Sequence, residues 1–415
     1  MVRNASWPFL IGALAISGGA PVALADAVPV RTGLDVLIAQ GFAPLRGKRI
    51  GLVTHRAATT ADGRDAAVVL SRAPGVRLVA LFAPEHGLRG AVPAGVRFGT
   101  ARDRATGLPV YSLYGALRRP TPRMLQGMDA LVVNLQDAGV RSYTYLSTLG
   151  LCMEAAATRN VELVVLDRPN PLGGEQMEGN SPNVLFRSFV GRYPVPYLHG
   201  MTFGELARMI QAEGWLVGRR RCRLTVIPMQ GWRRHMLWHA TGMRWVPTSP
   251  NVPDAETPRY LAATGIAGET SVVDVGAGTR FPFRVAGMPG LDGPAMAAHL
   301  NARGLPGVRF EPAVWTAAQG RYRGRLCAGV RLYIADGARA PLTRINFEIL
   351  AAVLRVRPGV RLFLPARARM FDQVCGTDRV RRELHAGHSP EAVWSRWHTS
   401  GRAFAVQRQP YLLYS

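Results

Sequence analysis

Short apolar runs alternate with helical stretches over the first 230 residues, and this alternation constrains the fold more than any other feature of the chain. Residues 49–54, 76–82, 130–135 and 161–166 are each mostly apolar. Continuous apolar runs of this length are typical of parallel strands that helices cover on both faces. Alternating strands and helices therefore predict an α/β fold built on a parallel sheet.

Polar side chains follow these runs directly. Right-handed crossovers bring the carboxyl ends of parallel strands to one edge of a sheet, and open α/β sheets bind their ligands at that edge. A carboxylic acid beside an imidazole, as at Glu85 and His86, suits general acid–base catalysis. Loops are polar in any protein, and Asp167 with Arg168 is equally well explained as a structural ion pair. The expected edge residues are His55, Glu85, His86, Gln136, Asp137, Asp167, Arg168 and Asn170.

The pattern changes near residue 250, where the run 245–258 contains four prolines. Beyond it we expect helices over 294–302, over 345–354 and from residue 389, and strands over 308–310 and 329–334. The chain is thus predicted to have three parts: a signal peptide at 1–25, an α/β domain at 26–245 and a smaller α+β domain at 246–415.

The first 25 residues have the features of a secretory signal. Arg3 precedes a short apolar run at 9–16, and Ala23-Leu24-Ala25 is a small-residue cleavage site. This predicts export, to a periplasm or out of the cell, with a mature chain that starts at Asp26. The run is too short to span a bilayer, and no later stretch is long and apolar enough, so the mature protein is not expected to span a membrane.

The net charge and the cysteine pattern limit which partners and cofactors the chain is expected to bind. A formal net charge of +24 favours polyanions such as cell-wall polymer or nucleic acid. The arginines are scattered, without an aromatic-interleaved basic motif, so nucleic acid is not expected. Neither a zinc-type Cys/His spacing nor a Gly-rich motif after the first strand occurs, so we expect no metal and no dinucleotide cofactor. Export permits disulfides, and three pairings are open to Cys152, Cys222, Cys327 and Cys375.

Several motifs together resemble a known family. They are GLVTHRAATTADGRD (51–65), LFAPEHGLRG (81–90), GLPVYSLYG (107–115), LQDAGVRSYTYLSTLGLCMEAA (135–156), LDRPNPLGG (166–174) and FRSFVGRYPVPYLHGMTFGELA (186–207). The chain resembles the NamZ-type exo-β-N-acetylmuramidases, most strongly over 45–215. The resemblance implies a Rossmann-like domain, a smaller C-terminal domain and an active site in the cleft between them. It also implies removal of β-linked N-acetylmuramic acid from the non-reducing end of peptidoglycan fragments.

The resemblance places the family's proposed acid/base glutamate on Glu85. His86, the next residue, is a candidate to orient Glu85 or to donate a hydrogen bond. Glycoside cleavage also requires a group that stabilises or captures the anomeric carbon. Asp137 is the first candidate for that role and Asp167 the second. Alternatively, the substrate's own N-acetyl group attacks, and a carboxylate only orients it.

Arginine binds carboxylates in a bidentate manner, so Arg89, Arg141 and Arg168 are candidates for the lactyl carboxylate of muramic acid or for a peptide carboxylate. Tyr143 is a candidate to stack on a sugar. Further candidates for binding the substrate are His55, Gln136, Asp167, Asn170, His199 and Glu269.

Two positions depart from the family pattern. Asn134 stands where relatives usually carry aspartate, and the run 269–279 (ETSVVDVGAGT) lacks an Asn, a Glu and an Arg of the usual motif. An exported binding protein that captures muropeptides without cleaving them is therefore an alternative. A metal-dependent cell-wall hydrolase that uses His55, His86, Asp137 and Asp167 is another.

Overall fold

The computed structural model describes residues 29–335, 340–399 and 401–415. The predicted signal peptide lies outside these residues. Within them, no helix has the length and apolar character needed to cross a membrane.

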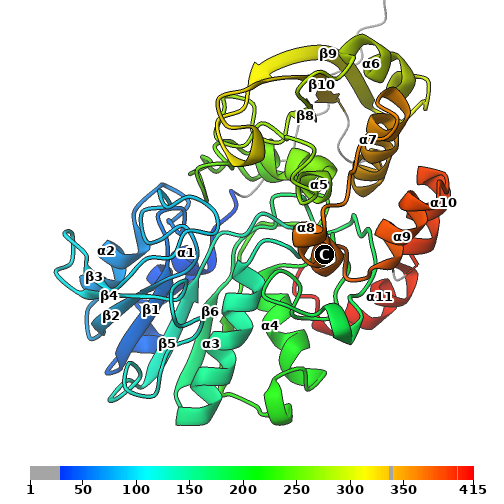
Figure 1. Ribbon diagram of the computed structural model, residues 1–415. Helices are drawn as coiled ribbons and strands as arrows, with labels where there is room; N and C mark the ends of the chain where they lie inside the picture. Colours follow the sequence, from blue (N-terminus) through cyan, green and yellow to red (C-terminus); the bar gives the residue numbers. More distant parts are fainter. Residues whose placement is uncertain (1–28, 336–339, 400) are drawn as a thin grey trace, which may run out of the picture.

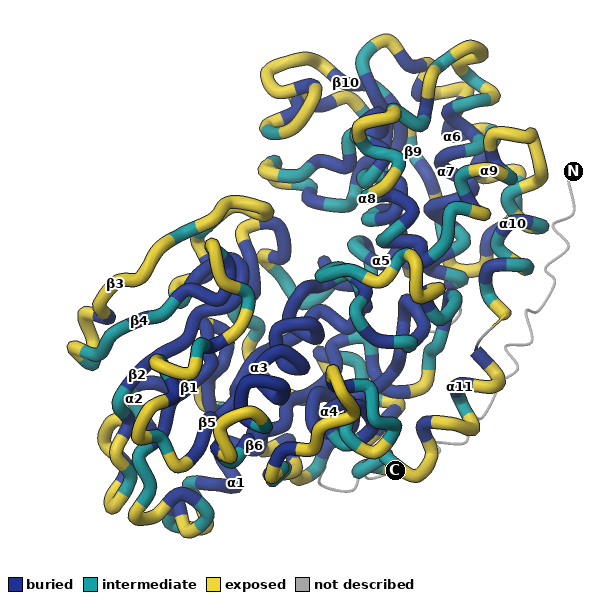
Figure 2. The backbone as a smooth tube through the Cα atoms, turned by 60° about the horizontal axis from the view of Figure 1, so that its bottom comes forward, coloured by how far each residue is buried: buried dark blue, intermediate teal, exposed yellow. Residues whose placement is uncertain are grey.

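A mostly parallel sheet forms the N-terminal half of the described chain (Figure 1), which confirms the predicted α/β class. Its strand order is β3-β4-β2-β1-β5-β6-β7, and only β3 runs antiparallel to its neighbour. The inner strand β5 is buried at every position, whereas β3 lies at the exposed edge (Figure 2). The strands are β1 (Arg49–Thr54), β2 (Arg77–Ala83), β3 (Ala101–Arg102), β4 (Pro109–Ser112), β5 (Ala130–Asn134), β6 (Glu162–Leu166) and β7 (Leu224–Ile227).

Helices cover both faces because successive strand residues point to opposite sides of the sheet. Val132 packs in one core with α1 (Gly33–Ala39) and α2 (Ala66–Ser71). Val133 packs in another with α3 (Tyr145–Arg159) and α4 (Phe203–Ala212).

A capping box of Thr202 and Glu205 starts α4, and Asp65 caps α2 through two backbone N–H groups.

The C-terminal domain carries an antiparallel sheet in the order β8-β10-β9. The strands are β8 (Val285–Met288), β9 (Val308–Thr316) and β10 (Leu326–Ile334). The helices are α5 (Thr257–Gly268), α6 (Gly293–Asn301), α7 (Leu342–Val356), α8 (Pro365–Cys375), α9 (Arg379–His385), α10 (Pro390–Trp397) and α11 (Gly401–Arg408). Short 3₁₀ helices lie at Ala43–Leu45, Val184–Phe186, Val217–Arg219, Trp238–Thr241, Gly320–Tyr322 and Gln409–Tyr411.

The C-terminal tail returns to the first domain. Arg408 donates to the carbonyl oxygens of Gly174 and Gly200, and the Tyr414 hydroxyl donates to Asp167. The final residues therefore help to hold the N-terminal domain together.

The sequence pattern misplaces some elements. Thr121-Pro122 predicts a helix up to residue 128, but the segment forms turns. The Thr121 hydroxyl accepts the backbone N–H of Met124, as a cap would, yet Gly127 turns left-handed (φ 69°) before a helix can extend. Strands β9 and β10 are longer than predicted because they pair with each other along their full length.

Candidate active site

A pocket of about 450 Å³ opens at the carboxyl edge of the large sheet and takes side chains from both domains. Glu85 and His86 enter it from the loop after β2, and Tyr143 and Thr144 from the segment before α3. Glu269, at the end of α5, enters it from the C-terminal domain. The other polar lining residues are Tyr114, Arg118, Ser142, Ser249, Asn251 and Arg367.

Glu85 is 6% exposed, and both of its carboxylate oxygens have partners. Oε1 accepts the backbone N–H of Gly95 at 2.8 Å, and Oε2 accepts the Thr144 hydroxyl at 2.6 Å. Thr144 is the N-cap residue of α3, and a carboxylate is stabilised near the N-terminus of a helix. The Tyr145 hydroxyl donates to the carbonyl oxygen of Glu85, so backbone and side chain are both held in place.

His86 lies beside Glu85 with a left-handed backbone (φ 72°). Its Nδ1 lies 2.9 Å from the carbonyl oxygen of Val92 and therefore donates to it. Burial lowers the pKa of His86, against the Val92 hydrogen bond and the Glu85 charge, which favours the neutral ring.

Glu269 is the second carboxyl group in this pocket. Its Oε2 lies 3.3 Å from Nη2 of Arg367, and a third of its side chain is exposed. Burial raises the pKa of Glu269, Arg367 opposes this, and the charge of Glu85 raises the pKa further. The two carboxyl groups therefore interact across the pocket.

Asp137 does not line the pocket. Its Oδ2 accepts the backbone N–H of Gly139 at 2.8 Å and lies 4.0 Å from Nε2 of His199. Burial raises the pKa of Asp137 to about 7, although backbone N–H groups oppose the shift. Burial, followed by the charge of Arg408, lowers the pKa of His199 to about 3, so that ring is neutral. The predicted second catalytic carboxylate is thus buried away from Glu85's pocket.

Three other predicted residues hold the strand ends to one another. His55 Nε2 accepts the backbone N–H of Gln136, and Gln136 Oε1 accepts Nε of Arg168 at 2.9 Å. Arg168 also donates to the Thr59 carbonyl oxygen. None of these side chains lines the Glu85 pocket.

Asp167 and Asn170 likewise act within the fold. Asp167 accepts the Thr202 hydroxyl at 2.7 Å and the backbone N–H of Gly204 at 2.8 Å, at the start of α4. Asn170 donates to the carbonyl oxygen of Met201. The structure places neither residue in the pocket.

Arg141 and Arg89, two of the arginines predicted to bind a carboxylate, also lie outside the Glu85 pocket. Arg141 is 1% exposed and donates to the carbonyl oxygens of Val195 and Val374, so its guanidinium links a loop of the N-terminal domain to helix α8 of the C-terminal domain. Arg89 forms an ion pair with Asp103 in a neighbouring pocket. The position of Arg141 or Arg89 in the sequence does not reveal the partner of either guanidinium, because each partner lies in a separate loop or helix.

Arg118, Thr144 and Arg367 line the pocket but were not expected from the sequence. Thr144 stands within the motif RSYTY, which had indicated Tyr143. Arg118 follows the motif YSLYG, which marked a family resemblance but no binding group.

The altered run 269–279 contributes little to the pocket beyond Glu269. Val272 and Val275 are buried in the apolar core, and Asp274 accepts the indole N–H of Trp315 at 2.7 Å. Gly276 and Gly278 have φ of 74° and 78°, so the run turns at its glycines. Asn134, the other departure, is fully buried, and its amide makes no hydrogen bond with the described residues.

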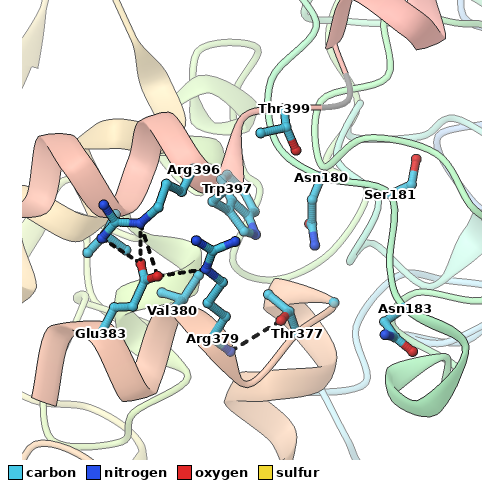
Figure 3. Close-up of a pocket in the computed structure, with 12 residues that line it drawn as sticks. Asn180, Ser181, Asn183, Thr377, Arg379, Val380, Glu383, Arg396, Trp397 and Thr399 are labelled. Atoms are coloured by element: carbon cyan, nitrogen blue, oxygen red, sulfur yellow. Dashed lines mark hydrogen bonds and ion pairs between the residues drawn. The ribbon is translucent and has the colours of Figure 1, made fainter. Parts of the chain in front are cut away.

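A second pocket, of about 340 Å³, lies between the segment 180–183 and helices α9 and α10 (Figure 3). Its acid, Glu383, accepts hydrogen bonds from Arg379 and from Arg396. Because that carboxylate is held by two guanidinium groups, it is a poor proton donor, and the Glu85 pocket is the better candidate for catalysis.

Among the described residues, no three His, Cys, Asp or Glu side chains are grouped to hold a metal ion. Cys152, Cys222, Cys327 and Cys375 are buried and unpaired.

Comparisons with known proteins agree over nearly the whole chain. Family models for the N-terminal and C-terminal parts of exo-β-N-acetylmuramidase NamZ match residues 50–256 and 260–414. The peptidoglycan β-N-acetylmuramidase NamZ of Bacillus subtilis (strain 168) is 37% identical over 385 residues, which cover 93% of this chain and 91% of that protein.

Two crystal structures of DUF1343 family proteins from Bacteroides fragilis NCTC 9343 share the fold. One has a TM-score of 0.88 and 38% identity, and the match covers 94% of this chain and all of that one. The other has a TM-score of 0.74 and 29% identity, and the match covers 94% of this chain and 99% of that one.

Asp137 should make the stability of the fold depend on pH. A carboxyl whose pKa is raised by folding, here from 3.8 to about 7, binds its proton more tightly in the folded state. Its stabilising contribution is complete below pH 4 and is lost as the pH rises through 7. Asp137→Asn cannot titrate, so between pH 4 and 7 its free energy of unfolding should fall less than that of the native protein, by about 2–4 kcal/mol.

Urea unfolding at a series of pH values measures this difference. Asp292→Asn is the control, because Asp292 is exposed and asparagine also caps a helix. Parallel pH profiles for Asp137→Asn and the native protein would contradict the assignment.

Proposed function

The chain belongs to the NamZ family of peptidoglycan β-N-acetylmuramidases, which are glycoside hydrolases, and from this we propose that it removes N-acetylmuramic acid from the non-reducing end of peptidoglycan fragments. Glu85 is the general acid and base. The observation that supports this most is that Glu85 shares one pocket with Glu269, a carboxyl group from the other domain.

The surroundings of Glu85 suit proton transfer. A hydroxyl group both donates and accepts, so Thr144 can hold the charged carboxylate as a donor and the neutral acid as an acceptor. Protonated Glu85 gives its proton to the glycosidic oxygen as the bond to the anomeric carbon breaks. The Gly95 N–H and the Thr144 hydroxyl fix the direction of the carboxyl group during that step.

Glu269 takes the role that the sequence suggested for Asp137, because Glu269 faces the substrate pocket and Asp137 does not. Burial raises the pKa of Glu269 and Arg367 beside it opposes that rise; in its ionised form the carboxylate stabilises positive charge that develops at the anomeric carbon. In many enzymes, two carboxyl groups in different surroundings have different pKa values, so that one acts as the acid and the other remains ionised.

We also propose that the protein acts outside the cytoplasm, where peptidoglycan lies, after cleavage of residues 1–25. Chain exported by a bacterial host should begin at Asp26, as intact-mass measurement of the purified protein can show. Ala25→Arg, which places a large charged residue at the cleavage site, should leave the signal attached. Full-length protein retained in the cytoplasm would contradict this proposal.

Loss of the acid should stop turnover without unfolding the protein. Glu85→Gln is expected to lower kcat on a β-linked N-acetylmuramic acid glycoside by about 100-fold or more, because glutamine cannot donate the proton. Glu175→Gln is the matched control at an exposed glutamate and should retain full activity. Circular dichroism and thermal unfolding check that both variants fold.

Native-like turnover by folded Glu85→Gln would exclude Glu85 as the acid. A native protein that binds the glycoside and never cleaves it would instead support the binding-protein alternative.

A further inference from the structure

Arg118 is held in an unusual way inside the Glu85 pocket. Its guanidinium carbon lies 3.9 Å from the centre of the Tyr114 ring and 4.4 Å from that of Phe189. The two ring centres are 5.9 Å apart, and all three residues line the pocket. Contact with two aromatic rings stabilises the cation and fixes a side chain that would otherwise be flexible.

The donors of Arg118 are not all used. Its Nη1 is buried and makes no hydrogen bond with the described residues. No described carboxylate lies within ion-pair distance of its guanidinium. Buried donors are nearly always paired, and a guanidinium fits a carboxylate with two parallel hydrogen bonds. A fixed arginine with a free buried donor is therefore suited to an anionic ligand.

Other arginines near the sheet edge already have partners. Arg367, the second cation of the pocket, pairs with Glu269. Arg89 pairs with Asp103, and Arg141 donates to backbone carbonyl oxygens. Among the described residues, Arg118 is thus the pocket cation that is available to a substrate.

The charge of the proposed substrate supplies the missing partner. N-acetylmuramic acid differs from N-acetylglucosamine by a lactyl ether that carries a carboxylate. Ionised Glu269, and Glu85 whenever it is ionised, would repel this third carboxylate in the same pocket, unless a cation offsets the repulsion. We propose that Arg118 binds the lactyl carboxylate and makes the enzyme prefer muramyl over glucosaminyl substrates. This inference rests on the proposed function.

The test compares two glycosides with the same chromogenic leaving group, N-acetylmuramic acid and its lactyl methylamide. The methylamide keeps the lactyl carbonyl group but carries no charge. Arg118→Gln should lower kcat/KM for the acid by about tenfold to a hundredfold, since it removes a charge-assisted hydrogen bond. The loss on the methylamide should be less than about threefold. Arg119→Gln is the matched control, because Arg119 is exposed and outside the pocket.

Equal losses on the acid and on the methylamide would overturn the proposal, since they would indicate a general effect on the pocket. Unchanged kcat/KM for the acid would overturn it as well.

A binding measurement separates this proposal from the proposed function. Calorimetry with free N-acetylmuramic acid and N-acetylglucosamine should show tighter binding of the acid by the native protein, and loss of that preference in Arg118→Gln. If the native protein cleaves no glycoside but shows this pattern, the proposed hydrolysis fails and the role of Arg118 holds. If it cleaves the muramyl glycoside and Arg118→Gln keeps the preference, the role of Arg118 fails alone.

Discussion

The polar side chains at the carboxyl edge of the large sheet are almost fully buried, and the rest of the structure depends on how they are paired. The C-terminal domain and the C-terminal tail cover this edge (Figure 1). A buried polar group costs stability unless it is hydrogen-bonded. Asp167 shows the consequence, because its carboxylate joins β6, the start of α4 and the tail through Thr202, Gly204 and Tyr414.

This pairing divides the edge residues into two groups. His55, Gln136 and Arg168 satisfy one another or nearby backbone, and so they hold the loops that carry the site. Glu85, with Glu269 opposite, faces an open pocket. The same burial that requires the first group to pair also positions the second group, so the pocket rests on a scaffold of polar contacts that lie outside it.

The sequence was sufficient to predict the sheet because buried strands have a continuous apolar pattern, and β1, β2, β5 and β6 lie within a residue or two of the predicted runs. It also identified Glu85, His86, Tyr143 and Glu269, which the structure places in one pocket. It could not separate pocket residues from scaffold residues, because position after a strand does not reveal a partner in another loop. Arg118 was missed for the same reason, since one of its two ring partners, Phe189, comes from a distant segment of the chain.

The most direct test of the account is the product pattern on a glycan of four sugars that alternates N-acetylmuramic acid and N-acetylglucosamine, with N-acetylmuramic acid at the non-reducing end. Mass spectrometry follows the products of the mature protein. The account predicts release of one N-acetylmuramic acid per glycan and a trisaccharide that begins with N-acetylglucosamine and is cleaved no further. Disaccharide products from internal cleavage, or release of N-acetylglucosamine first, would contradict it.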